Sequence, residues 1–428
     1  MAAITADPEQ ARAFARTVVL RLRGAGHEAL WAGGCVRDEL LGRTPADYDV
    51  ATSALPDEVR SLFGRSRTLA VGAAFGVITV IGPKGSGQVE VTTFRTDAEY
   101  TDGRHPAGVR FSSPREDAWR RDFTINGLFL DPVDGTVHDH VGGRADLAAG
   151  VVRAIGTPAL RFGEDHLRML RAIRFAAGFG FVLEADTRAA IERFAPMVAT
   201  VSPERVAAEL RAMVSRPGRS QALGLLRDTG LARVVLEELF PPGRGGAGPA
   251  DWDDACRTIG ALESPSLPAA LAILAEGLPE AVPAIAARLR LSNREAESAA
   301  WLRAALDTLA GPAAAPWDRP WSSVQPWLAD RDAGLLADVL RARAAVAAGS
   351  GASAAKGRLA EWVGERLAMP RHRLDPPPLL GGRDLLAAGI PGGPEVGATL
   401  ARLRALQLDG ELGSADEARA WLAARRGG

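Results

Sequence analysis

The sequence predicts an α+β protein, with an N-terminal head built on a mixed β-sheet and flanking helices, followed by all-helical neck, body and tail modules. The chain has 428 residues, more than one hydrophobic core usually organises, so two to four packed units are expected. Segments rich in β-branched residues gather in the first part of the chain, and long helical periodicity follows them. Loops rich in proline and glycine separate the helical parts. We place the modules at residues 1–150, 151–240, 241–370 and 371–428.

The elements of the head follow from local patterns in chain order. Residues 8–24 carry an apolar stripe at helical spacing, which predicts a helix. A short apolar run over 28–32 ends at two glycines, and residues 35–41 have the pattern of a second helix. Strands are expected where β-branched residues gather, at 47–51, 77–81 and 89–94.

Composition limits the classes of function. Apolar residues make up 47% and charged residues 24%, which is typical of a globular protein in water. The formal net charge of -1 gives no overall attraction to phosphate, so a nucleic acid partner would need local basic surfaces. Two cysteines are too few for a disulfide framework, which fits a reducing, cytoplasmic setting. The sequence has neither a signal-peptide core nor an apolar run of about 18 residues, so we expect no membrane span.

Three acidic residues point to a metal site in the head. Asp47 and Asp49 are two residues apart in a predicted strand, where alternate side chains leave the same face. Neighbouring carboxylates are costly unless a cation neutralises them, and magnesium prefers such hard oxygen ligands. Glu90 lies in another predicted strand, and three acids would suit two metal ions about 4 Å apart. Taken alone, an Asp-x-Asp is more often a solvated surface pair.

Gly33 and Gly34 stand between a predicted strand and a predicted helix. Because they lack side chains, the backbone can approach a phosphate closely, and the start of the helix offers free N–H groups. Arg37 falls in the first turn of that helix, where its guanidinium could reach a phosphate oxygen. The alternative interpretation is a plain tight turn followed by a surface arginine.

Five ordered segments carry a family pattern: GGCVRDELLGRTPADYDV (33–50), VEVTTFR (89–95), RRDFTINGLFLDP (120–132), RFGEDHLRMLRAIRFA (161–176) and SPERVAAEL (202–210). Together they resemble the class II CCA-adding enzymes and bacterial poly(A) polymerases, which belong to the nucleotidyltransferase superfamily of DNA polymerase beta. Residues 381–412 are similar to the family's C-terminal, RNA-facing region. The resemblance covers most of the chain and is weakest over residues 245–375.

The resemblance implies a catalytic nucleotidyltransferase head in which Asp47 and Asp49 bind Mg²⁺ and Glu90 is the third carboxylate. It implies a helical neck that selects the nucleotide and a tail that binds tRNA, with CTP and ATP as substrates and no obligate protein partner. The residues that it assigns to the incoming nucleotide are Gly33, Gly34, Arg37, Arg120, Arg121, Asp122, Asn126, Asp165, Arg168, Arg171 and Arg174.

Base selection is expected from the segment 161–174, which has the pattern of one helix with Asp165 and Arg168 on a shared face. The plain alternative is an exposed ion pair worth a few tenths of a kcal/mol. Cytosine and adenine both present an amino donor beside a ring-nitrogen acceptor, so a carboxylate and a guanidinium can bind either base. Uracil and guanine place a carbonyl oxygen and a ring N–H there, and both contacts become repulsive. The resemblance implies this use of the pair, without a nucleic acid template.

Three functions stay open at this point. The first is CCA addition, and the second is a sister activity on the same scaffold, either poly(A) synthesis or addition of the terminal A alone. The third is an inactive RNA-binding homologue. Residues 94–111 resemble the loop that full CCA-adding enzymes need for the switch from C to A, although His105 stands where arginine is more usual. The complete loop favours CCA addition, and the retained acids favour an active enzyme.

Overall fold

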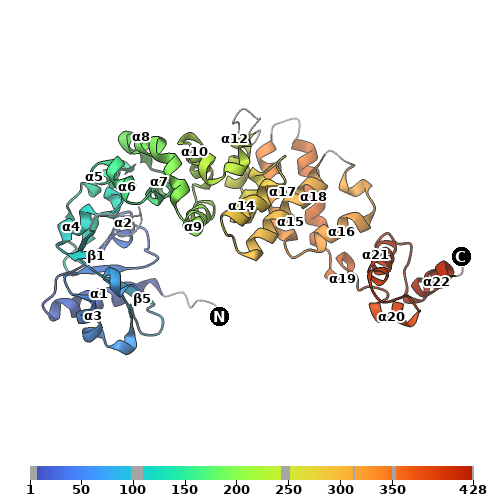
Figure 1. Cartoon of the computed structure of the whole chain (residues 1–428), viewed down its shortest axis with the longest axis horizontal. Coiled ribbons are helices and arrows are strands. Elements are labelled where there is room, and N and C mark those ends of the chain that lie inside the picture. The colour runs from blue at the N-terminus through green and yellow to red at the C-terminus, as the bar shows by residue number, and fades with distance from the viewer. Residues whose placement is uncertain (1–6, 98–108, 242–250, 312–313, 349–352, 427–428) are drawn as a thin grey trace. The chain divides into compact units, whose positions relative to one another are not determined.

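The computed structural model describes residues 7–97, 109–241, 251–311, 314–348 and 353–426 (Figure 1). Its residues form two compact units. The first comprises Met1–Met213 with Gln221–Val235, and the second comprises Val214–Ser220 with Leu236–Gly428. The predicted division into four modules is finer than these two units and stays a prediction. None of the described helices is both long and apolar enough to cross a membrane.

The first unit is built on a mixed sheet of seven strands in the order β3-β4-β5-β2-β1-β8-β9. Only β2 and β5 run parallel, and the other neighbouring pairs are antiparallel. The strands are β1 (Ala29–Ala32), β2 (Asp49–Thr52), β3 (Thr68–Leu69), β4 (Val77–Ile81), β5 (Gln88–Thr93), β8 (Leu128–Leu130) and β9 (Val137–Asp139). The predicted mixed sheet with flanking helices is therefore confirmed.

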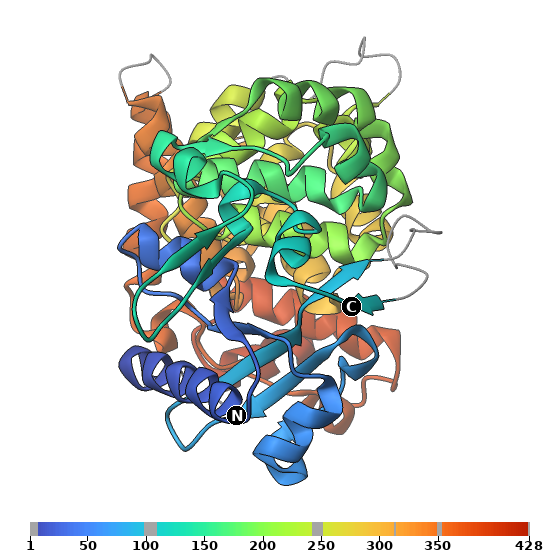
Figure 2. The same cartoon turned by 90° about the vertical axis from the view of Figure 1, so that its left-hand side faces the viewer.

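Helices α1 (Pro8–Gly24) and α3 (Pro56–Phe63) pack against this sheet (Figure 2). The predicted helix over 8–24 is confirmed, and the Asp7 carboxylate caps it by accepting from the Gln10 N–H at 3.0 Å. Helix α2 (Gly34–Leu40) and strand β4 also agree with the sequence patterns. One strand differs, because β2 begins only at Asp49 and Asp47 lies in the bend before it.

Short helices and two small sheets complete the first unit. Strand β6 (Arg95–Asp97) pairs with β7 (Val109–Phe111), and β10 (Val151–Val152) pairs with β11 (Val182–Leu183). The helices are α4 (Pro114–Trp119), α5 (Gly143–Ala149), α6 (Pro158–Glu164), α7 (Leu167–Phe179), α8 (Ala185–Phe194), α9 (Pro203–Val214), α10 (Arg219–Asp228) and α11 (Ala232–Val235), with α9 and α10 reaching into the second unit. The predicted loop at 94–111 falls largely on residues 98–108, which lie outside the described part of the chain.

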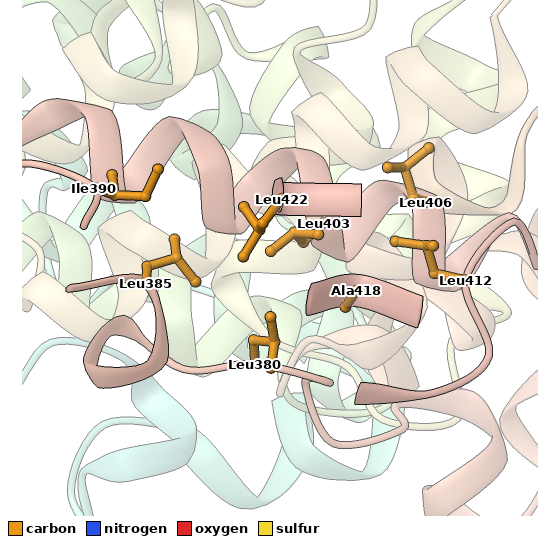
Figure 3. Packing of buried hydrophobic residues seen from close by; sticks show 8 residues of the cluster. All are labelled: Leu380, Leu385, Ile390, Leu403, Leu406, Leu412, Ala418 and Leu422. Carbon is orange, nitrogen blue, oxygen red and sulfur yellow. The ribbon is translucent and has the colours of Figure 1, made fainter. Parts of the chain in front are cut away.

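The second unit is helical throughout its described residues, as the sequence predicts. Its helices are α12 (Trp252–Gly260), α13 (Leu267–Leu274), α14 (Ala281–Arg288), α15 (Asn293–Ala310), α16 (Trp321–Ala329), α17 (Ala333–Ala347), α18 (Ser353–Leu367), α19 (Arg371–Leu374), α20 (Gly382–Ala387), α21 (Pro394–Leu408) and α22 (Ala415–Arg426). Figure 3 shows that buried side chains of α20, α21 and α22 face one another and form a small core of their own. That core includes Leu385, Leu403 and Leu422, so the three C-terminal helices pack as a group.

Candidate active site

The three predicted acids gather at the junction of β2 and β5. Asp49 is the register partner of Glu90 in this parallel pair, so both side chains leave the same face of the sheet. Burial first, and then the negative charges of Asp47 and Glu90, raise the pKa of Asp49 from 3.8 to about 7, although Arg121 acts in the opposite direction. Asp47 and Glu90 themselves are exposed. The register places Asp49 and Glu90 on one face, whereas Asp47 lies in the bend before β2, so the strand alternation expected for Asp47 and Asp49 does not apply.

The acids provide only part of a metal coordination sphere. Within the described residues, no group of three or more His, Cys, Asp or Glu side chains is arranged to hold a metal ion. Magnesium typically uses one or two carboxylates and completes its octahedron with water and substrate phosphates. Asp47 and Asp49 supply hard oxygen donors of that kind, and the mutual repulsion that raises the pKa of Asp49 would be relieved by a cation. The residues therefore fit a divalent ion that is shared with a phosphate-bearing substrate.

Tyr48, between the two aspartates, ties them to the helices behind the sheet. Its hydroxyl donates to Glu39 Oε1 at 2.8 Å, and Arg12 Nε donates to the same oxygen at 2.7 Å. The Tyr48 ring also packs on Trp31, with 4.7 Å between the ring centroids. The segment that carries the aspartates is thus fixed to both α1 and α2.

The glycine turn brings the backbone close to a neighbouring arginine. Gly33 has a φ of 72° and caps the start of α2, a conformation that favours glycine. A Cβ atom placed there would lie 2.6 Å from Arg121 Nη1. A side chain at Gly33 would therefore collide with the Arg121 guanidinium. The sequence analysis expected a close approach of the Gly33 backbone to a phosphate, and in the structure the group that lies close to Gly33 is Arg121.

Arg37 does not present a free guanidinium, contrary to the sequence expectation. Its side chain is buried, Nε and Nη2 pair with the Asp38 carboxylate, and Nη1 donates to Asn126 Oδ1 at 2.6 Å. The guanidinium also stacks over Phe179, 4.6 Å from the ring centroid. Because each nitrogen already has a partner, Arg37 orients Asn126 and does not reach out from the first turn of the helix.

The RRDFTIN segment forms a buried ionic network. Asp117 is fully buried and accepts hydrogen bonds from both Arg120 Nε (2.7 Å) and Arg121 Nη2 (3.0 Å). Asp122 accepts from Asn126 Nδ2 at 3.0 Å and from Arg171 Nε at 2.8 Å. Burial acts to raise the pKa of Asp122, but the Arg171 charge and the Asn126 hydrogen bond outweigh it and lower the pKa to about 2. These predicted nucleotide contacts are therefore brought together and held rigidly.

The segment 161–174 is not one helix, so that prediction is wrong. Helix α6 ends at Glu164, Asp165 has an extended backbone (φ -152°, ψ 105°), and α7 begins at Leu167. The i,i+3 relation needs a continuous helix, so Asp165 and Arg168 do not share a helical face, and the ion pair of the plain alternative is not formed either. The two residues stay close because the Arg168 N–H donates to the Asp165 carbonyl at 3.0 Å.

Each member of the predicted pair has another partner. Arg205 donates two hydrogen bonds to the Asp165 carboxylate, at 2.7 and 3.2 Å. Arg168 Nη1 donates to Glu164 at 2.5 Å, and its Nη2 donates to the Arg120 carbonyl at 3.2 Å. The last contact joins the segment 161–174 directly to the RRDFTIN segment.

Several residues of the site were not identified from the sequence. Glu209 pairs with Arg174 at 2.6 Å, and Arg205 holds Asp165. Both lie in SPERVAAEL, a segment singled out by resemblance but given no chemical role. Phe175 stacks under Arg171 and Arg174, with 5.3 and 4.3 Å to the ring centroid. No sequence signal marked Asp117. Phe175 lies in the segment 161–176 that carries the resemblance, but it was given no role, because its importance depends on partners that only the fold supplies.

Comparisons with known proteins agree with this geometry. The family model of the poly A polymerase head domain matches residues 29–153, and that of the probable RNA and SrmB-binding site of polymerase A matches residues 180–241. A CCA-adding enzyme of Geobacillus thermodenitrificans is 38% identical over 331 residues, which is 76% of each chain. The chain belongs to the CCA-adding enzyme family.

Solved structures of CCA-adding enzymes support the assignment across the whole chain. The Bacillus stearothermophilus CCA-adding enzyme in complex with CTP is 31% identical, with a TM-score of 0.75 and 96% of both chains covered. The Thermotoga maritima CCA-adding enzyme complexed with tRNA shares the fold at 20% identity, with a TM-score of 0.64. The predicted fold class and the predicted family are thereby confirmed.

The anchoring of Tyr48 leads to a first prediction for this CCA-adding family member. Tyr48→Phe keeps the ring on Trp31 but removes the hydroxyl that donates to Glu39, so the protein should lose about 1 kcal/mol of stability. We also expect the Mg²⁺ concentration for half-maximal nucleotide incorporation to rise about tenfold, because the flanking aspartates lose part of their support. A variant with lower stability but an unchanged Mg²⁺ dependence would show that Tyr48 only packs.

The raised pKa of Asp49 leads to a second prediction, for the metal-free protein. Between pH 3.8 and about 7 the folded chain keeps the Asp49 proton that the unfolded chain loses, so the stability from this group falls as pH rises. Asp49→Asn should therefore be more stable than the natural protein at pH 8 by about 1–3 kcal/mol, with little difference at pH 4. Urea unfolding in EDTA at both pH values measures this. An equal gain at both pH values, or no gain at pH 8, would contradict it.

Proposed function

We propose that this protein adds CCA to the 3′ end of tRNA from CTP and ATP, without a nucleic acid template. The observation that carries the proposal is the register match of Asp49 with Glu90, with Asp47 beside them, in a chain of the CCA-adding enzyme family. The relatives named above are described with CTP or tRNA, which supports the same substrates here.

Asp47 and Asp49 would hold two divalent ions, preferably Mg²⁺, together with the triphosphate of the incoming nucleotide. Bound there, such ions lower the pKa of the RNA 3′ hydroxyl and neutralise charge on the phosphoryl group and the leaving pyrophosphate. The side chains of the protein itself would position these ions and the two aspartates. Glu90 adds negative charge beside the pair, and Tyr48 fixes the segment on which both aspartates lie.

The nucleotide would bind against the arginine network of the RRDFTIN segment and α7. The Asp117 carboxylate orients Arg120 and Arg121, which leaves their remaining N–H groups for triphosphate oxygens. Gly33 and Gly34 give the phosphates room beside Arg121. Asp122, Asn126, Arg171 and Arg174 form the supporting wall, in which each charge is paired before the substrate arrives.

Asp165 and Arg168 would read the base although they do not pair with each other. A carboxylate can accept about four hydrogen bonds, so the two from Arg205 leave Asp165 able to accept from an amino group. Within the described residues, no hydrogen bond involves Arg168 Nε, and Nη2 donates only to the Arg120 carbonyl. Two N–H groups of Arg168 therefore remain for the ring nitrogen and carbonyl of cytosine, or for the ring nitrogen of adenine.

The test uses purified protein with CTP and ATP and three tRNA substrates, ending before CC, before A, or after the complete CCA. Adding CCA to the first and A to the second, and nothing to the third, is the expected result. Long A-tracts on any RNA would favour poly(A) polymerase instead. Activity only on the tRNA that lacks the terminal A would favour the A-adding enzyme, and inactivity on all three would favour an inactive RNA-binding homologue.

A further inference from the structure

The second unit contains a cavity that the proposed reaction does not use. It has a volume of about 290 Å³, is open to solvent on one side, and is lined by residues of α12, α15, α17, α18 and the short 3-10 helix Pro316–Asp318. Its walls are largely apolar and include Leu309, Pro316, Trp317, Leu340 and Leu359. A concave, mostly apolar cavity with a few convergent polar groups is typical of a small-molecule site.

Two cations point into this cavity, Arg343 and Lys356. Only about a tenth of the Arg343 side chain is exposed, and its Nη2 donates to the Glu276 carboxylate at 3.0 Å. Among the described residues this is the sole hydrogen-bond partner of the Arg343 guanidinium. Arg343 and Glu276 also line a second cavity of about 140 Å³, so their ion pair forms a partition between the two spaces.

Lys356 distinguishes this cavity from an ordinary gap between helices. The chain has only two lysines, Lys84 and Lys356, among 51 basic residues. Lys356 is half-buried at the cavity wall, and within the described part of the chain no hydrogen bond or ion pair engages it. The ammonium group is therefore available to a ligand.

Two cations and two carboxylates line the cavity: Arg343, Lys356, Asp254 and Glu276. Glu276 pairs with Arg343, and Asp254 pairs at 3.2 Å with Arg257, which lies outside the lining. Lys356 is thus the charged lining group without an ion-pair partner among the described residues, and it lies beside an apolar wall. Trp317 gives that wall a flat aromatic surface, with the Arg358 guanidinium stacked 4.4 Å from its ring centroid. A complementary ligand carries one negative charge on a flat apolar body.

We propose that this cavity binds a small aromatic monoanion, with its ring among Trp317, Leu340 and Leu359. Its carboxylate binds the Lys356 ammonium and the N–H groups of the Arg343 guanidinium that do not donate to Glu276. Binding replaces water at a half-buried ammonium with a charge-assisted hydrogen bond and covers apolar wall. The site lies entirely within the second unit and is independent of the proposed catalytic residues, which lie in the first.

The probes are indole-3-acetate and its neutral amide, titrated into the full-length protein by isothermal calorimetry. One molecule of the acid should bind per chain, and the amide should bind about tenfold more weakly because it lacks the charge. Lys356→Met should weaken binding of the acid about five- to tenfold and leave the amide unchanged. Lys84→Met is the matched control and should change neither.

A steric variant tests the place of binding. Ala355 is exposed and lines the cavity, so Ala355→Trp should abolish binding of both probes, whereas Ala354→Trp, at an exposed neighbour outside the lining, should not. Circular dichroism confirms that each variant is folded. Equal affinity for acid and amide, undiminished binding by Lys356→Met or Ala355→Trp, or no binding of either probe at millimolar concentration would overturn the proposal.

Discussion

Replacing Asp49 by alanine is expected to lower nucleotide incorporation into tRNA by at least about 1,000-fold, while tRNA affinity changes by less than about twofold. The physical reason is that loss of one of the two carboxylates at the ion site removes several kcal/mol of stabilisation of the phosphoryl group in transfer. RNA affinity depends on contacts to phosphates over a much larger surface, to which one carboxylate contributes little. Single-turnover incorporation of CMP, with filter binding of the same tRNA, measures both quantities.

The matched control for this experiment is Asp57→Ala. Asp57 is an exposed acid in the first turn of α3 and is not one of the acids at the β2–β5 junction. Its replacement should leave incorporation unchanged. If Asp49→Ala incorporated CMP at the natural rate, or if both variants lost activity equally, the assignment of Asp49 as a metal ligand would have to be withdrawn.

The architecture of the head could be predicted because local pattern and tertiary structure agree there. The apolar stripe over residues 8–24 coincides with the observed helix α1 at both ends. The alternation in β4 and β5 likewise matches a sheet with one buried face. Asp49 and Glu90 could be expected to share a face, but their direct register follows from the parallel pairing of β2 and β5, which no local pattern specifies.

The segment 161–174 shows where such prediction stops. Residues 161–174 have helical periodicity on both sides of Asp165, so a single helix was the natural interpretation. The break at Asp165 is stabilised by Arg205, 40 residues away in sequence, and by the bond from Arg168 to the Arg120 carbonyl, 48 residues away. One long-range ion pair and one long-range hydrogen bond to a backbone carbonyl thus override local helix propensity, and the chain offers no proline at this point to reveal it.

Other contacts with α7 change the interpretation of Arg37. From its place in a first turn after two glycines its guanidinium was expected to reach a phosphate oxygen, whereas Phe175 and Phe179 of α7 cover it. Those phenylalanines come from a segment more than a hundred residues later, so only the tertiary fold could place them. Asn126, which the sequence analysis assigned to the nucleotide site, is bonded to both Arg37 and Asp122 and so joins charged groups.

Asp165→Ala is expected to reduce discrimination between CTP and UTP by at least about 100-fold, measured as the ratio of kcat/KM values on a tRNA that lacks CCA. With the carboxylate absent, the uracil carbonyl no longer meets a negative charge, so UTP gains while CTP loses its amino contact. The Mg²⁺ dependence should not move, because the acids at the β2–β5 junction are untouched. Asp186→Ala, an exposed acid in the first turn of α8, is the matched control and should keep full selectivity.

Asp165 also holds Arg205, so the alanine variant frees a guanidinium beside the base, and a second variant must separate the two effects. Arg205→Gln leaves the Asp165 carboxylate in place but removes its charged partner. If selectivity depends on the carboxylate itself, Arg205→Gln should keep most of the preference for CTP and lower kcat/KM for both nucleotides alike. If instead Asp165→Ala stays as selective as the natural protein, the base is read elsewhere, and the contact between Asp165 and Arg205 is a structural brace between α6 and α9.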